Sequence, residues 1–369
     1  MVLKNLEKLA VEADLLSIDP NIQNTLDVLI NDYQNHAKLN DLGRFLVYRG
    51  LSKRLAIRLS LENLNKDTAS IDQQGPIFIS GLPRSGTSFL FSLLHAHSSL
   101  RSPLTWEIFQ ADSVAKNQLE ILIKKIKTQF ELFGINRLVP ELSTIHPMEH
   151  AQPEECQLIT AYDLKSISFA YSANLPNYIK LISDSSFKTS FRVHKMFLDA
   201  LHSKNDETIW LLKDPCHIEH TQEILETYPK ARFVFIHRHP KFSVPSISNL
   251  AYNLRLGFSD HVDKKLVGEQ MLSHWHNACE KLLKHRGLIP EDQMIDIRFD
   301  HLVDDPLNAA HRIIEKFSIT HDEKLKNKLA SQITKEKPKM SHAYSYEEFF
   351  DTSGEVEKRF ENYISYFDL

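Results

Sequence analysis

The sequence predicts an α/β fold in which a P-loop-like parallel sheet is flanked by helices. Two observations lead to this prediction: short apolar runs alternate with helical patterns, and the first run enters a glycine turn that opens an amphipathic helix. The expected strands cover residues 76–80, 208–214, 232–238 and 294–299. The clearest helical patterns between and after these strands cover residues 217–229 and 307–318.

The residues before the first expected strand have the pattern of a helical amino-terminal segment. Apolar residues repeat at helical spacing on two faces: Ile22, Leu26, Leu29, Ile30 and Tyr33 on one, and Leu51, Leu55 and Leu59 on another. A polar connection at 63–76 ends in Gly-Pro, which is typical of a boundary. We therefore expect a helical segment over 1–74 that packs on a main domain over 75–369. A mostly helical insertion over 107–205 should follow the first βα unit.

Composition narrows the class of protein and its partners. The 369 residues include 44 Lys and Arg against 48 Asp and Glu, a net charge of −4, which argues against a broad nucleic-acid-binding surface but not against a local basic pocket. The first residues have no apolar core of a signal peptide, and no apolar run is long enough for a transmembrane segment. The three cysteines are far apart and are interpreted as reduced thiols. We expect a cytoplasmic protein, and the composition is compatible with a homo-oligomer.

The stretch GLPRSGTS, residues 81–88, has the composition of a phosphate-binding loop. Gly81 and Gly86 have the G-x-x-x-x-G spacing, but Thr87 stands where a triphosphate loop carries its lysine. Arg84 supplies a fixed charge, and the serines and threonine supply hydroxyl donors at the start of a helix. The expected ligand-binding residues are Arg84, Ser85, Gly86, Thr87 and Ser88. Without the lysine, the loop fits a metal-free phosphate diester better than a triphosphate with magnesium.

A second anion site is expected after the strand at 232–238. Arg238 ends this apolar run, and Ser246 follows eight residues later, near the expected start of a helix. This spacing can bring a guanidinium and a hydroxyl together around a second phosphate. Taken alone, Arg238 is equally well explained as a strand-end ion-pair residue.

Both stretches together resemble the sulfotransferase family that uses 3′-phosphoadenosine 5′-phosphosulfate (PAPS). The resemblance is closest to the bacterial branch called sulfotransferase family 3. It extends through PLTWE (103–107), HAQPEEC (150–156), LLKDPCHIEH (211–220) and HLVDDPLNAAHRI (301–313). A looser similarity reaches the protein-tyrosine sulfotransferases. The resemblance implies that the loop at 81–88 binds the 5′-phosphosulfate and that Arg238 with Ser246 binds the 3′-phosphate.

The resemblance also supplies the catalytic candidates. Glu107 matches a glutamate proposed as the general base, although a glutamate in the first turn of a helix also interacts with the helix dipole. His150 competes for that role, because histidine titrates near neutral pH; it precedes Pro153–Glu155, which have the pattern of a first helical turn. Lys213 matches a lysine beside the leaving group, with an ion pair to Asp214 as the alternative.

No metal site is expected. The sequences HRH (237–239) and HWH (274–276) suggest ligands, but neither has cysteines or carboxylates at matched spacing nearby in the sequence.

The predicted function is sulfuryl transfer from PAPS, as co-substrate, to a hydroxyl of a small-molecule, lipid or glycan acceptor, with no metal required. The alternatives are a P-loop nucleotide kinase or NTPase, and a non-catalytic regulator that binds PAPS or its product 3′-phosphoadenosine 5′-phosphate (PAP).

Overall fold

The computed structural model describes residues 20–63, 75–138, 148–202, 207–320, 346–352 and 354–369. The chain divides into two compact units. The first comprises residues 1–69, 104–202 and 249–267, and the second comprises residues 70–103, 203–248 and 268–369. The predicted division into a segment 1–74 and a domain 75–369 cuts the chain at a single point, and it stays a prediction.

The second unit is built on a five-stranded sheet in the order β2-β3-β1-β4-β5, with every neighbouring pair parallel. The strands are β1 (Ile77–Gly81), β2 (Leu100–Arg101), β3 (Ile209–Lys213), β4 (Arg232–His237) and β5 (Met294–Arg298). The four expected strands are confirmed, and the P-loop-like α/β fold with them. The sequence gives no sign of β2, a two-residue edge strand.

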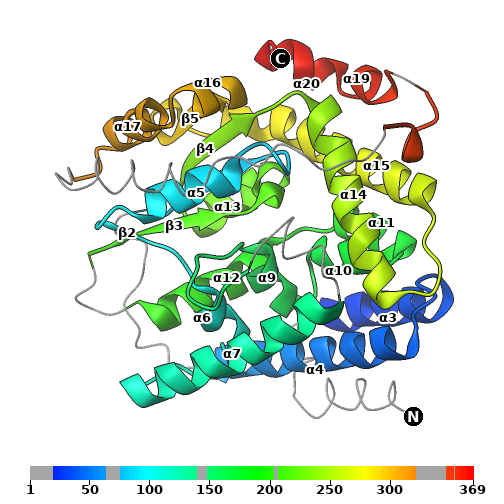
Figure 1. The fold of residues 1–369 in the computed structure, drawn as a ribbon. Coiled ribbons are helices and arrows are strands. Elements are labelled where there is room, and N and C mark those ends of the chain that lie inside the picture. Colours follow the sequence, from blue (N-terminus) through cyan, green and yellow to red (C-terminus); the bar gives the residue numbers. More distant parts are fainter. Residues whose placement is uncertain (1–19, 64–74, 139–147, 203–206, 321–345, 353) are drawn as a thin grey trace. The chain divides into compact units, whose positions relative to one another are not determined.

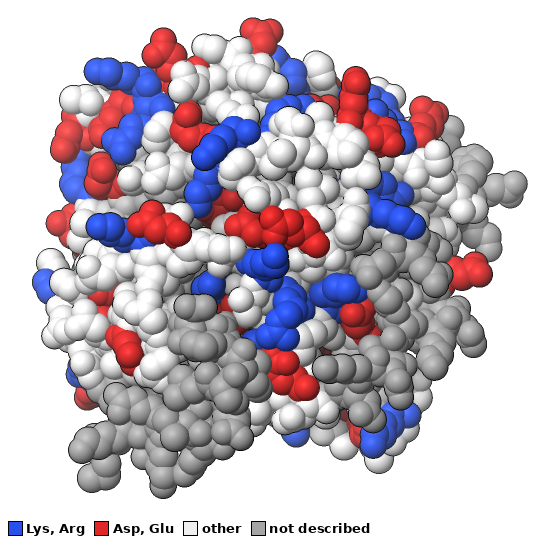
Figure 2. Space-filling view, turned by 180° about the vertical axis from the view of Figure 1, so that it is seen from behind, with Lys and Arg blue, Asp and Glu red and all other residues white. Residues whose placement is uncertain are grey.

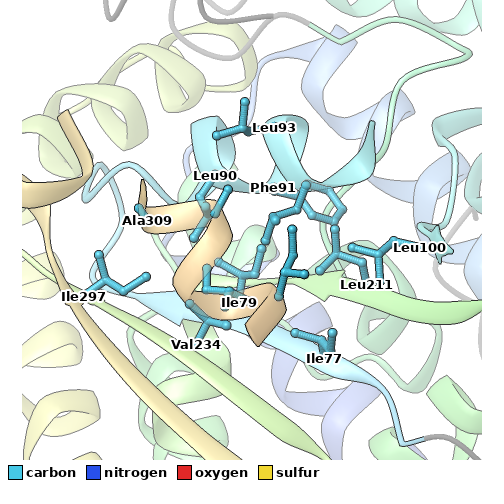
Figure 3. Packing of buried hydrophobic residues seen from close by; sticks show 14 of the residues in the cluster. Ile77, Ile79, Leu90, Phe91, Leu93, Leu100, Leu211, Val234, Ile297 and Ala309 are labelled. Carbon is cyan, nitrogen blue, oxygen red and sulfur yellow. The ribbon is translucent and has the colours of Figure 1, made fainter. Parts of the chain in front are cut away.

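One face of this sheet is covered by two helices. Figure 3 shows apolar side chains of α5 (Thr87–His95) and α17 (Pro306–Lys316) packed against the inward-facing residues of the strands. Leu90, Leu93 and Ala310 are fully buried there, against Ile77 and Ile79 of the central strand. Strand residues alternate between faces, so the side chain between these two isoleucines belongs to the opposite layer.

The opposite face is packed with aromatic rings. Phe78 stacks on Phe233 at 5.8 Å between centroids and contacts His217 and Tyr228 at 4.9 and 5.5 Å. His217 lies in the short helix η3 (Pro215–Glu219), and Tyr228 follows α13 (Thr221–Thr227). The expected helix at 217–229 is therefore interrupted at His220.

The remaining described helices of the sheet-containing unit come after β4 in the chain. They are the start of α14 (Pro240–Phe258), most of α15 (Lys264–His285), η4 (Arg286–Leu288), η5 (Glu291–Gln293), α16 (Phe299–Asp304), η6 (Tyr346–Glu348), α19 (Glu355–Arg359) and α20 (Glu361–Phe367) (Figure 1).

The regular elements of the first unit's described residues are helices, apart from two isolated antiparallel bridges, one between Leu39 and Ser259 and one between Leu104 and Pro153. The unit contains α3 (Pro20–Asn35), α4 (Asp41–Asn63), α6 (Thr105–Phe109), α7 (Gln118–Leu138), α9 (Gln157–Thr160), η2 (Ala161–Asp163), α10 (Ser168–Ser172), α11 (Pro176–Asp184), α12 (Lys188–Leu201) and the end of α14. The predicted helical insertion over 107–205 is thus confirmed in the residues described.

The amino-terminal helices bury the faces that their sequence patterns predict. All five apolar residues of the first pattern are buried in α3, and Leu51 and Leu55 are buried in α4, while Leu59 is half-buried. A buried carboxylate fixes α3 to α11: Asp32 accepts hydrogen bonds from Tyr178 N at 2.9 Å and from Asn177 Nδ2 at 2.7 Å. The bond to Tyr178 N satisfies one of the donors left open in the first turn of α11.

The surface has no dominant charge on the face drawn in Figure 2, where basic and acidic side chains are interspersed. This agrees with the small net charge of the sequence. Among the described helices, none is both long enough and apolar enough to cross a membrane.

Candidate active site

The phosphate loop connects the central strand β1 to α5 through a tight turn. Gly81, the last residue of β1, has φ +148°, and a Cβ there would lie 2.3 Å from the carbonyl oxygen of Ile236 on β4. Gly86 is the N-cap of α5 with φ 89°, a left-handed conformation that glycine adopts without strain. Arg84 also has a positive φ, 65°, which costs a residue with a side chain about 1–2 kcal/mol. Close packing and backbone conformation therefore require both glycines of the motif.

The loop holds a hydroxyl that is buried without a hydrogen-bond partner among the described residues. Ser85 Oγ is fully buried, while Ser85 N donates to Leu82 O at 3.2 Å inside the turn. A buried hydroxyl with no partner costs about 1–3 kcal/mol, so such groups in a native protein call for an explanation. A phosphate oxygen at the start of α5 would accept this hydrogen bond. Thr87 is buried beside it, and Ser88 is exposed.

Arg238 is bound to the phosphate loop by its side chain. Its Nη1 donates to Arg84 O at 2.5 Å, and its guanidinium lies 4.1 Å from the ring centroid of Phe299 and 5.4 Å from that of Phe242. The hydrogen bond and the two rings hold the guanidinium plane in place. The two predicted phosphate sites are therefore in direct contact, a link that the sequence pattern does not reveal.

Lys213 is the last residue of β3, next to the central strand. Its side chain is 2% exposed, and its Cα pairs with that of Ile79, two residues before Gly81. The carboxylate of Asp214 accepts from Cys216 N at 2.9 Å and so begins η3. The carboxyl ends of β1, β3 and β4 thus present the loop, Lys213 and Arg238 at one edge of the sheet, where ligands bind in open α/β sheets. Ser246 lies in the second turn of α14, directly after Pro245.

Glu107, in the first unit, stands in the first turn of the short helix α6. Its side chain is 7% exposed, and its Oε2 accepts a hydrogen bond from Leu104 N at 2.9 Å. One oxygen of this carboxylate therefore caps α6. This is a structural role at the helix start, of the kind considered above as the alternative to catalysis. Because the cap uses Oε2 alone, it is compatible with a role of Glu107 as the general base.

His150 belongs to a segment that pairs with the start of α6. His150 O accepts from Trp106 N at 2.9 Å, and Pro153 forms an antiparallel bridge with Leu104. Because Pro153 is extended there, the helix predicted to begin at 153–155 begins instead with α9 at Gln157. This pairing brings the two candidate bases into adjacent backbone segments. His150 Nδ1 lies 2.9 Å from Oε1 of Gln129 on α7.

Comparisons with known proteins agree with the loop and the sheet. A family model described as the sulfotransferase family matches residues 76–323, which include the phosphate loop, Lys213, Arg238 and both candidate bases. The chain belongs to the sulfotransferase family.

Individual sulfotransferases resemble the chain at low sequence identity. Omega-hydroxy-beta-dihydromenaquinone-9 sulfotransferase Stf3 of Mycobacterium bovis is 22% identical over 260 residues, which cover 66% of this chain and 63% of that relative. The structure of sulfotransferase STF1 from Mycobacterium tuberculosis matches with a TM-score of 0.77 and 24% identity, covering 96% of this chain and 98% of that one. Sulfotransferase STF9 from Mycobacterium avium matches with a TM-score of 0.83 and 18% identity, covering 98% and 96%. These two structures establish the likeness of fold.

His237, the first histidine of HRH, has hydrogen-bond partners within the second unit of this sulfotransferase-family chain. His237 Nδ1 is 2.8 Å from the hydroxyl of Tyr363, and its Nε2 is 2.7 Å from Asp296 Oδ1. Burial lowers the pKa of His237, and the carboxylate of Asp296 opposes that effect. We interpret this histidine as part of the packing between β4, β5 and α20.

His274 of HWH lies in a buried cluster that sequence spacing did not reveal. Possible ligand atoms of Cys216, Glu219 and His274 all lie within 4.8 Å of one another. However, the ammonium of Lys281 is 3.7 Å from Glu219 Oε2, and a divalent cation at the carboxylate would be repelled by it. We therefore interpret the cluster as a structural polar contact around the buried Glu219 rather than as a metal site. The contact joins η3 to α15, residues about 60 positions apart, so no local sequence signal could have found it.

Glu219→Gln is expected to change how stability depends on pH. Burial raises the pKa of Glu219 to about 7, above its ordinary 4.5, although Lys281 opposes this. Between these two pH values the folded state binds more protons than the unfolded state, so wild-type stability falls as pH rises, by up to about 3 kcal/mol. The glutamine variant lacks this loss. Its melting temperature should therefore rise relative to wild type as pH increases from 4.5 to about 7.

The control is Glu291→Gln, at an exposed glutamate of η5, which should follow the wild-type curve at every pH. Parallel curves for Glu219→Gln and wild type would contradict the interpretation of Glu219 as a buried group that is protonated on folding.

Proposed function

We propose that the chain transfers the sulfuryl group of PAPS to a hydroxyl of a small-molecule, lipid or glycan acceptor and releases PAP. The observation that carries the proposal is the loop after β1. Its Ser85 hydroxyl is buried without a hydrogen-bond partner among the described residues, and Arg238, directly after the neighbouring strand β4, donates to Arg84 O of the same loop. Thr87 in place of the lysine favours a phosphosulfate over a triphosphate with magnesium. Family membership supports this donor. The name of the Mycobacterium bovis relative, a dihydromenaquinone sulfotransferase, favours a lipid among the three acceptor classes.

Each site residue has a role in this proposal. Backbone N–H groups of Gly86 and Thr87, with the hydroxyls of Ser85 and Ser88 and the charge of Arg84, would hold the 5′-phosphosulfate. Arg238 and Ser246 would hold the 3′-phosphate.

The chemical step needs a cation at the leaving group and a base at the acceptor. Lys213 would stabilise charge that develops on the bridging oxygen as the sulfur–oxygen bond breaks. Glu107 would take the proton of the acceptor hydroxyl, with His150 as the competing candidate. The step needs no metal in this proposal.

Ligand-dependent melting tests the donor site. PAP is expected to raise the melting temperature of the protein in the presence of EDTA, because a ligand that binds only the folded state stabilises it by mass action. ATP with magnesium should raise it much less. Stronger stabilisation by ATP with magnesium than by PAP would instead favour a nucleotide kinase.

Arg238→Ala tests the assignment of the 3′-phosphate. A lost charge-assisted hydrogen bond should weaken PAP by about 10–100-fold. Adenosine 5′-phosphosulfate, which has no 3′-phosphate, should lose less, although some loss is expected because Arg238 also holds the carbonyl of Arg84. Arg312→Ala, at an exposed arginine of α17, is the control. Equal losses for both nucleotides would contradict the assignment.

A further inference from the structure

Helix α7, in the first unit, exposes its apolar side chains to solvent. Its six large exposed apolar residues have exposed fractions between 44% and 73%: Leu119, Leu122, Ile123, Ile126, Phe130 and Phe133. At 100° per residue their spacing places them on one stripe about 100° wide along the helix. Scattered single apolar residues are normal on a protein surface, but a continuous apolar stripe marks an interaction site.

The inward face of α7 differs from that of an ordinary amphipathic helix, because it buries polar side chains. Lys124 is buried, and its ammonium donates to Gln110 O at 2.5 Å and to Ser113 O at 2.7 Å. Thr128 is also fully buried, with its hydroxyl bonded to Lys124 O. The inward face therefore carries buried polar groups beside the buried Leu132, while the six apolar residues of the stripe face out.

Basic residues flank the apolar stripe, and the acidic residues of the helix are occupied locally. Lys125 and Lys127 lie on opposite sides of the stripe, and Arg137 is exposed near its carboxyl end. Glu131 pairs with Lys53 at 2.7 Å, and Glu120 accepts from Lys116 N and Asn117 Nδ2 at the helix start. An apolar face with cations at its borders is the pattern of a helix that lies in the surface of a membrane containing anionic lipids.

A second copy of the chain is a poorer occupant. The stripe is centred on Ile126, so a two-fold antiparallel pairing of α7 helices would bring the Lys125 and Lys127 of one copy close to the same lysines of the other. Like charges at the centre of an apolar contact oppose such pairing, whereas lipid phosphates complement them.

We propose that the exposed face of α7 docks the protein on a bilayer that contains anionic lipids, from which a lipid acceptor can be taken. The acceptor part rests on the proposed function. Within the first unit, α7 contacts His150 itself and Trp106, the residue before Glu107. Gln129 Oε1 is 2.9 Å from His150 Nδ1, and Lys125 Nζ is 5.9 Å from the ring centroid of Trp106, the neighbour of Glu107. A lipid that enters along α7 would therefore meet the segments that carry the bases.

Co-sedimentation with vesicles tests the docking. The protein should bind vesicles of phosphatidylcholine mixed with phosphatidylglycerol, and bind phosphatidylcholine vesicles less. Combining Leu122→Ser and Phe130→Ser should lower binding by about tenfold or more, because two apolar side chains no longer enter the bilayer. Combining Lys127→Glu and Arg137→Glu should lower binding to the anionic vesicles by about tenfold or more and abolish its salt dependence. Leu288→Ser, at an exposed leucine of η4, should leave binding unchanged.

Each variant is first shown to be folded by its melting temperature. Absence of binding by the wild-type protein, or unchanged binding by the leucine–phenylalanine variant, overturns the proposal. So does sedimentation equilibrium that shows a wild-type dimer, converted to a monomer by the same variant, without vesicle binding. Docking and catalysis fail separately: vesicle binding without any stabilisation by PAP would reject the proposed function while the docking surface stands.

Discussion

Lys213→Met is expected to lower kcat by about 10²–10³-fold, the usual effect of removing one group that stabilises charge in the transition state. Methionine fills the space of the lysine stem in a site where the side chain is 2% exposed, so the sheet should remain intact. The charge on the bridging oxygen develops only as the sulfuryl group leaves. PAP affinity should therefore change much less than kcat.

The measurement compares kcat with the dissociation constant of PAP in the variant and in Lys316→Met, a control at an exposed lysine of α17. Near-normal kcat in folded Lys213→Met would assign the lysine a structural role, as in the ion pair with Asp214 considered from the sequence.

The strands of the sheet could be predicted because they are buried on both faces. A parallel strand covered by helices is a nearly continuous apolar run, and β1, β3 and β4 have this composition. The edge strand β2 has only Leu100 and Arg101, which is too short for any periodicity. The expected helix at 217–229 failed at one point because Asp214 caps η3 through Cys216 N, and the chain turns at His220 before α13 begins.

The phosphate loop could be predicted because all its determinants are local. Gly81, Arg84 and Gly86 lie within six residues, and the conformation that each adopts is a property of the turn. The hydrogen bond from Arg238 to Arg84 could not be predicted, because it depends on the pairing of β1 with β4, 154 residues apart at this contact. The roles assigned to these side chains stay predictions.

The exposed face of α7 illustrates a different limit. A helical repeat of apolar residues tells which residues share a face, but not whether that face meets the protein core or the solvent. The burial of Lys124, Thr128 and Leu132, together with the exposure of the stripe, establishes the orientation of this helix.

Glu107→Gln should lower kcat by about 10²–10⁴-fold, the usual contribution of a general base. The structure makes glutamine a clean replacement, because its side-chain oxygen can still accept the hydrogen bond from Leu104 N that caps α6. Helix α6 should therefore form normally, and PAP affinity should be nearly unchanged. Glu107→Ala would remove the cap as well as the charge, and so could not separate structure from chemistry.

His150→Asn is the matched test of the competing base, and the two variants have opposite expectations. If Glu107 is the base, the loss at His150 should be clearly smaller and should appear mostly in the KM of the acceptor, since the histidine would only position the hydroxyl. The contact with Gln129 Oε1 fits a proton on Nδ1, which would leave Nε2 able to accept a proton, so His150 is chemically competent for the role. The backbone pairing of His150 O with Trp106 N does not involve the side chain and should survive the substitution.

The comparison requires that both variants are folded and that an acceptor is known. Near-normal kcat in Glu107→Gln together with a loss of several orders of magnitude in His150→Asn would then reverse the assignment. Histidine would then be the base, and Glu107 would serve α6 as its cap.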